Sequence, residues 1–219
     1  MKEKQGKAIF GGSFDPIHRG HLAIAEAAYA QLPVDEVILM PTRLRYYKKS
    51  SVMTRDEERL AMLELSVEPY PYMSVSTMEL STPVEENYTV NTLNRLKVEH
   101  PDWEIYFVMG GDSLAYLDTW YRAEELMQLA TFVAAVREDV DAEQALLLMG
   151  KYRREFPGSR FSLLHTDPVD ISSTEIRRRV AEGGDISEMV PTQVETYIRK
   201  HGLYLPAAEP DAAFVPGEE

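Results

Sequence analysis

One segment near the start of this 219-residue chain, residues 11–21, constrains the fold and the chemistry more than any other. It lies between an apolar run at residues 8–10, which predicts a buried strand, and an alanine-rich run at residues 22–28, which predicts a helix. The segment begins with Gly11 and Gly12, and glycine lets a backbone approach a ligand closely because it has no Cβ. The unpaired N–H groups of a helix N-terminus favour phosphate. We therefore expect a nucleotide phosphate to bind at this strand-to-helix turn.

Two histidines, His18 and His21, stand at the predicted helix start. Residues three positions apart share one face of a helix, so both imidazoles are expected to point the same way. Such a pair could also be two ligands of a metal ion, but no third ligand follows at a spacing typical of zinc sites. The pair therefore indicates a role in binding phosphate groups and stabilising their negative charge.

The composition of the chain narrows the classes of function. There is no cysteine, which excludes disulfides and thiolate catalysis. The net charge of −13 argues against a nucleic-acid partner, because most of the surface would repel a phosphate backbone. Residues 1–7 are charged, unlike a signal peptide, and no apolar run approaches the roughly 20 residues that cross a bilayer. We therefore expect a cytoplasmic protein without a membrane partner.

Strand-like and helix-like segments alternate along the chain. Further strands are expected at residues 36–41, 73–76, 104–109, 131–136 and 160–164, and further helices begin near residues 54, 88, 141, 171 and 191. This alternation predicts an α/β fold with a Rossmann-like, doubly wound, mostly parallel sheet and helices on both faces. We expect one domain over residues 1–205 and a disordered acidic tail over residues 206–219.

Three helix ends carry local signals. Thr54 to Glu57 and Ser172 to Glu175 each match a capping box, in which a hydroxyl and a carboxylate three residues apart satisfy backbone N–H groups. Gly202 stands where a glycine would end the last predicted helix.

Three segments are expected to meet at one edge of the sheet. In doubly wound sheets, ligands bind beyond the carboxyl ends of the strands. Residues 11–21, residues 110–112 and the helix start at Ser172 all follow predicted strands. The sequence therefore predicts that these segments form one ligand site.

The segments resemble known motifs. Residues 11–21 resemble the GGxFDPxHxGH signature of the nucleotidyltransferase superfamily, and residues 171–177 resemble its ISSTxxR motif. Residues 87–93, 110–114 and 119–121 resemble segments of the bacterial nicotinate-nucleotide adenylyltransferases. The resemblance covers about residues 7–205. It implies adenylyl transfer from ATP to nicotinate mononucleotide, giving nicotinate adenine dinucleotide and pyrophosphate in NAD biosynthesis.

The resemblance also implies roles for individual residues. His18, His21 and Arg177 would be catalytic through their contacts with the phosphates, and no enzyme nucleophile is needed. Mg²⁺ would accompany ATP and be held mainly by phosphates and water, without a protein metal site. The residues expected to bind ATP are Gly11, Gly12, Ser13, Phe14, His18, His21, Asp112, Ser173, Thr174 and Arg177.

On the side of the mononucleotide, the resemblance implies contacts from Lys48, Thr89, Trp120 and Tyr121. Trp120 offers a flat face to the pyridine ring. Members of the family often carry Pro-His-Lys after the second strand, whereas residues 46–48 here are Tyr-Tyr-Lys. This departure bears on the affinity for the mononucleotide and not on the reaction type.

Other families carry parts of the same motifs. Phosphopantetheine adenylyltransferases and nicotinamide-preferring enzymes share the superfamily signature. Class I aminoacyl-tRNA ligases use a similar HxGH motif, but this chain has no KMSKS-like loop. A non-catalytic sensor of a dinucleotide is disfavoured because His18, His21 and Arg177 are all present. The sequence leaves open whether the chain forms a homo-oligomer and whether residues 43–49 close over substrate.

Overall fold

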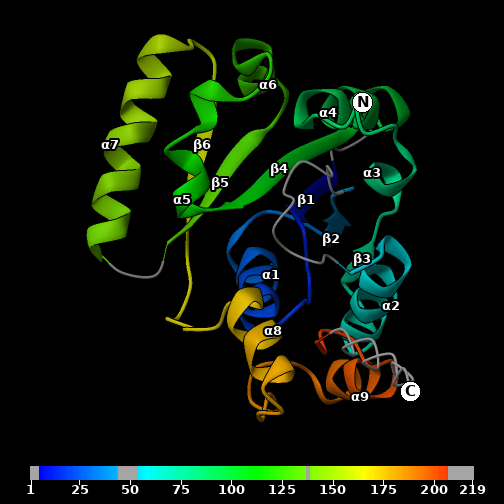
Figure 1. Cartoon of the computed structure of the whole chain (residues 1–219). Helices are drawn as coiled ribbons and strands as arrows, with labels where there is room; N and C mark the ends of the chain where they lie inside the picture. Colours follow the sequence, from blue (N-terminus) through cyan, green and yellow to red (C-terminus); the bar gives the residue numbers. More distant parts are fainter. Residues whose placement is uncertain (1–4, 44–53, 137–138, 207–219) are drawn as a thin grey trace, which may run out of the picture.

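A computed structural model describes residues 5–43, 54–136 and 139–206 (Figure 1). Its centre is a six-stranded sheet in which every neighbouring pair of strands is parallel, in the order β3-β2-β1-β4-β5-β6. The order reverses between β1 and β4, where doubly wound sheets bind their ligands. The strands are β1 (Gln5–Gly12), β2 (Glu36–Pro41), β3 (Met73–Val75), β4 (Trp103–Gly110), β5 (Thr131–Val136) and β6 (Arg160–His165).

Short helices account for most of what the sequence did not predict. The four missed elements, α3, α5, η1 and α6, each have at most seven residues, too few for an apolar period to emerge. The helices are α1 (Arg19–Gln31), α2 (Asp56–Val67), α3 (Met78–Ser81), α4 (Thr89–Glu99), α5 (Gly111–Leu114), the 3₁₀ helix η1 (Leu117–Thr119), α6 (Ala123–Leu129), α7 (Asp139–Glu155), α8 (Ser173–Ala181) and α9 (Thr192–Lys200).

Helices pack on both faces of the sheet. One buried apolar layer joins α1, α2, α8 and α9 to one face, and the other joins α4, α6 and α7 to the opposite face. The neighbouring strand residues Ile9 and Phe10 enter different layers, as the alternation of side chains along a strand requires. The predicted doubly wound α/β fold is confirmed, with a sheet that is wholly rather than mostly parallel.

The structure confirms some of the predicted helix-end signals and contradicts one. The capping box at Thr54 is wrong: α2 begins at Asp56, its N-cap is Arg55, and no side chain caps it. The three acidic residues of its first turn favour that helix end electrostatically instead. Ser172 is the N-cap of α8 and accepts from the backbone N–H of Glu175 at 3.2 Å, which confirms one half of the predicted capping box. The Glu175 carboxylate accepts from Arg178 and Arg179. Gly202 has φ 60° and follows α9 in the predicted capping position.

Candidate active site

The turn after β1 places the two signature histidines against each other. His18 is the N-cap of α1, and its Nδ1 accepts from the backbone N–H of His21 at 3.3 Å. The backbone N–H of His18 in turn donates to Nδ1 of His21, also at 3.3 Å. The two rings stack with centroids 3.7 Å apart. This reciprocal capping box was not predicted, because histidine is not among the residues that usually form one.

The capping geometry determines which ring atoms remain for a ligand. A neutral imidazole that accepts through Nδ1 carries its proton at Nε2. Burial, together with the neighbouring His18, holds the pKa of His21 well below its usual value, so His21 is neutral in the unliganded site. The pair therefore offers N–H donors at Nε2 at the N-terminus of α1.

The Phe14 side chain packs against the ring of His21. It is fully buried and meets that ring edge-on, with centroids 5.0 Å apart. The Phe14 φ of 46° lies in the left-handed region, which turns the chain sharply after β1. A Cβ at Gly12 would stand 3.0 Å from the Phe14 ring, so any larger residue there would have to displace that buried ring. The Phe14 side chain is therefore part of the buried core, and its contact with ATP stays a prediction.

Helix α8 brings the second motif onto the same turn. The Ser173 hydroxyl donates to the carbonyl oxygen of Pro16 at 2.9 Å, and the Arg177 guanidinium donates to that of Asp15 at 2.6 Å. Arg177 also donates to the Thr174 hydroxyl at 3.3 Å. The predicted meeting of the two motifs is confirmed, across more than 150 residues of sequence.

The third predicted segment lines a pocket of about 280 Å³ next to α1. Gly110, Gly111 and Asp112 form one wall, and Ile24 of α1 and residues of α7 form others. Asp112 is exposed in the first turn of α5, immediately after β4. Its carboxylate is thus accessible to a ligand at the carboxyl end of β4.

The predicted mononucleotide residues gather in a second pocket. This acceptor pocket, of about 250 Å³, is lined by Asn87, Tyr88, Thr89, Val90, Trp120, Tyr121 and Leu126. The Tyr88 and Tyr121 rings lie 4.3 Å apart, and Trp120 meets Phe107 of β4 edge-on. Three of the four predicted residues thus come together. The fourth, Lys48, lies outside the described residues, as do residues 44–49 of the basic loop.

Comparison with known proteins places this site in a family. The sequence profile of the cytidylyltransferase-like family matches residues 9–179. A probable nicotinate-nucleotide adenylyltransferase of Lachnoclostridium phytofermentans is 41% identical over 197 residues, which cover 90% of this chain and 98% of the relative. One from Dehalococcoides mccartyi is 39% identical over 204 residues, covering 90% and 95%. The chain belongs to the nicotinate-nucleotide adenylyltransferase family.

Solved structures share the fold of this adenylyltransferase. Plasmodium falciparum nicotinic acid mononucleotide adenylyltransferase complexed with NaAD superposes with a TM-score of 0.73 at 22% identity. The match covers 91% of this chain and 97% of that one, and a complex of the same protein with APC gives the same values. At this identity the likeness shows the common fold.

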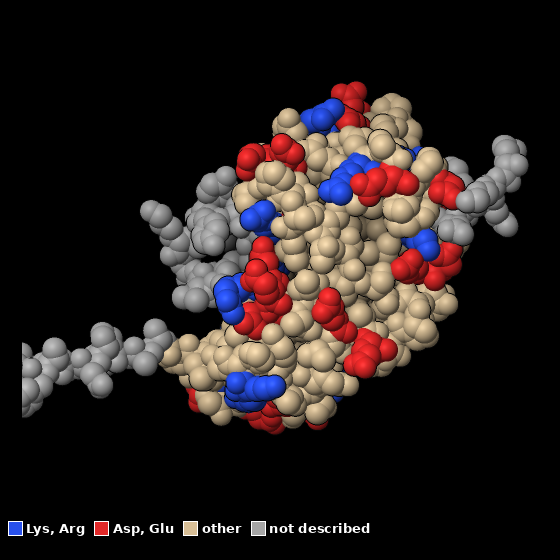
Figure 2. Space-filling model, turned by 90° about the vertical axis from the view of Figure 1, so that its right-hand side faces the viewer, with Lys and Arg blue, Asp and Glu red and all other residues tan. Residues whose placement is uncertain are grey.

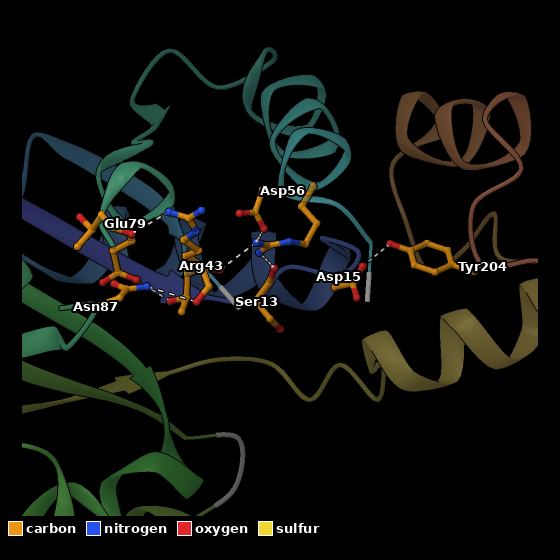
Figure 3. Close-up of polar contacts among 10 residues, drawn as sticks. Ser13, Asp15, Arg43, Asp56, Glu79, Asn87 and Tyr204 are labelled. Atoms are coloured by element: carbon orange, nitrogen blue, oxygen red, sulfur yellow. Dashed lines mark hydrogen bonds and ion pairs between the residues drawn. The ribbon is translucent and has the colours of Figure 1, made fainter. Parts of the chain in front are cut away.

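A buried arginine joins the turns after β1 and β2 of the adenylyltransferase, and the sequence analysis assigned it no role. Arg59 of α2 is fully buried and donates to the carbonyl oxygens of Ser13 at 2.5 Å and Thr42 at 2.9 Å. It also pairs with Asp56 at 2.6 Å. The turns after β1 and β2 are therefore held by one side chain, as the contacts around Ser13 and Asp56 in Figure 3 show. The available signal was a charged residue on the apolar face of a helix.

Glu79 supports the acceptor side in a similar way. Its side chain is buried and accepts from the hydroxyls of Thr42 at 2.7 Å and Thr92 at 2.9 Å. Burial raises the pKa of this carboxyl group above its usual value. The Asn87 side chain donates to the carbonyl oxygen of Arg43, so the acceptor pocket is anchored next to the end of β2 (Figure 3).

The surface of the adenylyltransferase carries both signs of charge. Figure 2 shows acidic and basic side chains interspersed over the described part of one face, without a continuous basic stripe. Arg178 and Arg179 are exposed and pair with Glu175 of the same helix, and Arg178 also pairs with its C-cap, Glu182. Within the described ranges, no helix is both long and apolar enough to span a bilayer.

Proposed function

We propose that the chain transfers the adenylyl group of ATP to nicotinate mononucleotide. An oxygen of the acceptor 5′-phosphate attacks the α-phosphorus, the bond to the oxygen that bridges the α- and β-phosphates breaks, and pyrophosphate leaves with the electron pair. The names of the relatives support this acceptor. The observation that carries the proposal is the stacked His18–His21 pair at the start of α1, because it presents donors to phosphate without an enzyme nucleophile.

The phosphate half of the site supplies fixed positive potential. The Nε2–H groups of His18 and His21 act as donors to the transferring phosphoryl group and the leaving pyrophosphate. Arg177 adds a full positive charge whose position is set by its bond to Asp15. Because contacts within the protein orient these donors, little reorganisation is needed as charge develops in the transition state. Asp112 is expected to accept from the ribose hydroxyls of ATP in its own pocket.

Mg²⁺ is the proposed cofactor. The described residues contain no group of three or more histidine, aspartate or glutamate side chains that could hold a metal ion by themselves. This donor set fits an ion that is held mostly by the substrate phosphates and water. When bound, the ion neutralises phosphate charge, and His18, His21 and Arg177 orient the phosphates around it.

The acceptor half combines an aromatic wall with a helix N-terminus. The Trp120 ring offers its face to the pyridine ring, and Tyr121 and Thr89 line the same pocket. Helix α4 begins at Thr89, and its N-cap Tyr88 contributes no side-chain hydrogen bond to the helix end. The first N–H groups of α4 therefore favour an anion, which suits the carboxylate of nicotinate better than the amide of nicotinamide.

Pyrophosphate release tests the proposal. The protein is incubated with ATP, Mg²⁺ and one of three acceptors: nicotinate mononucleotide, its nicotinamide analogue or phosphopantetheine. Highest kcat/KM with nicotinate mononucleotide is expected. Turnover with only one of the other acceptors would retain the phosphate roles and reject those of Thr89, Trp120 and Tyr121. ATP binding without turnover on any acceptor would reject the reaction.

A further inference from the structure

The chain returns to the active site after its last helix. Residues 202–204, here called the C-terminal turn, follow α9. The backbone N–H of Leu203 donates to the carbonyl oxygen of Ile198 at 3.0 Å, and Gly202 with φ 60° reverses the chain direction. Leu203 and Tyr204 then pack against the apolar layer that contains α1 and α2. Tyr204 has a φ of 64°, so the turn is held in a conformation that residues with a Cβ rarely adopt.

The C-terminal turn ends on a buried carboxylate of the signature. The Tyr204 hydroxyl donates to Oδ1 of Asp15 at 2.8 Å, as Figure 3 shows. Asp15 is only 1% exposed, and its Oδ2 has no hydrogen-bond partner within the described part of the chain. A buried carboxylate depends strongly on the few donors that reach it. Burial and the nearby Asp15 raise the pKa of Tyr204, which keeps its hydroxyl protonated as a donor.

Asp15 is therefore held from two directions. Arg177 of α8 donates to its backbone carbonyl oxygen, and Tyr204 donates to its side chain. The next residues, Pro16 and Ile17, are buried and lead directly to His18, the N-cap of α1. A change in the position of Asp15 would consequently displace the start of α1 and the two stacked rings.

We propose that Tyr204 is a positioning residue for adenylyl transfer, acting through Asp15 on the His18–His21 pair. The inference rests on the proposed function only for its kinetic readout. The C-terminal turn lies more than 180 residues from residues 11–21 in sequence. The hydrogen bond between Tyr204 and Asp15 therefore forms only when the chain has folded.

The first test removes one hydroxyl. In Tyr204→Phe, kcat is expected to fall about 10-fold while KM for each substrate stays within about twofold, because misaligned donors lose transition-state contacts selectively. Tyr197→Phe is the matched control. The Tyr197 hydroxyl on α9 donates to Glu58 of α2 at 2.7 Å. Tyr197 therefore links the C-terminal part of the chain to α2 through one hydroxyl, without contacting residues 11–21. Its kcat is expected to stay at the unmutated level.

A second readout does not depend on the acceptor. With ¹⁵N-labelled histidine, the ring nitrogens of His18 and His21 are expected to shift in Tyr204→Phe and not in Tyr197→Phe, in the full-length protein without substrate. Unchanged ring signals in folded Tyr204→Phe, an unchanged kcat, or an equal loss of kcat in Tyr197→Phe would each overturn the proposal. If the unmutated protein does not use nicotinate mononucleotide, the proposed function fails, and the ring signals still decide the role of Tyr204.

Discussion

The phosphate half and the acceptor half of this site are built differently. In the turn after β1, Phe14, Asp15 and His18 are buried, and contacts from α2 and α8 hold its carbonyl groups. The acceptor pocket is more open: Tyr121 is 52% exposed, and its walls come from α4, α6 and the segment after η1. Donors to a transferring phosphoryl group must be oriented before reaction, whereas an aromatic wall needs only to fit a ring. This difference predicts that substitutions in the phosphate half lower kcat and that substitutions in the acceptor half lower the affinity for the mononucleotide.

The largest effect is expected from the histidine pair. His18→Ala or His21→Ala should lower kcat by about 100-fold or more, because each removes an Nε2–H donor aimed at developing charge. Each also removes half of the cap of α1, at a cost of about 1 kcal/mol, which leaves the protein folded. Pyrophosphate release gives kcat, and circular dichroism verifies folding.

A third histidine serves as the control for this prediction. His100 stacks on Trp103, the first residue of β4, and thus lies at the opposite edge of the sheet from the site. His100→Ala should leave kcat unchanged. Near-normal turnover in folded His18→Ala and His21→Ala would show that the phosphate half does not depend on these rings.

Arg177 allows a comparison within one helix. Arg177→Met should lower kcat by about 10- to 100-fold, because it removes both a charge near the phosphates and a tether to Asp15. The neighbouring Arg178 is exposed and bonds only to Glu175 and Glu182 among the described contacts, so Arg178→Met should change kcat by less than about twofold. An equal decrease of kcat in the two variants would mean that the effect comes from a less stable α8 and not from Arg177 itself.

In the acceptor half, Trp120→Ala should raise KM for nicotinate mononucleotide by about 10-fold, because the pyridine ring loses its aromatic wall. KM for ATP and kcat should change little. Trp120→Phe, which retains an aromatic face, should show a smaller increase. A loss confined to kcat would contradict the division of the site into a rigid phosphate half and an open acceptor half. Initial rates at varied concentrations of each substrate separate these results.

The two halves also differ in what the sequence could predict. The phosphate half is encoded locally: Gly11, Gly12, His18 and His21 lie within one strand-turn-helix unit whose chemistry follows from residue type and spacing. The fold could be predicted in the same way, because buried strands and amphipathic helices alternate over most of the chain. The resemblance to family motifs added the acceptor residues, which no periodicity in the sequence assembles.

The tethers could not be predicted, because their partners are backbone groups or distant residues. Arg59 and Ser173 donate to backbone carbonyl oxygens, which every residue has. The types of the residues involved therefore do not indicate that these hydrogen bonds will form. The histidine capping box depends on two rings that each accept a backbone N–H, and sequence rules assign that role to shorter side chains. Such contacts arise only when the folded backbone has brought the segments together.

The smallest expected effect is a pH dependence of stability, which can be compared between two buried glutamates, one beside the acceptor half and one on α2 away from the signature. Glu79, beside the acceptor half, has its pKa raised by burial, so the folded state holds its proton to a higher pH than the unfolded chain does. Its contribution to the free energy of unfolding should therefore decrease as pH rises from the ordinary glutamate range through the raised pKa. Glu58, on α2, has its pKa lowered by the Tyr197 hydroxyl and by Arg55.

The stabilising contribution of Glu58 should accordingly be present above the ordinary glutamate pKa and be lost as pH falls through the lowered one. Urea unfolding between about pH 3 and pH 8 of the unmutated protein, Glu79→Gln and Glu58→Gln measures both contributions as differences. The two difference curves should slope in opposite directions. A flat difference curve for Glu79 would mean that burial does not raise its pKa, and a curve parallel to that of Glu58 would mean that its pKa is lowered. Either result would contradict the buried state of Glu79 with its raised pKa, and with it the support that this side chain gives to the acceptor half.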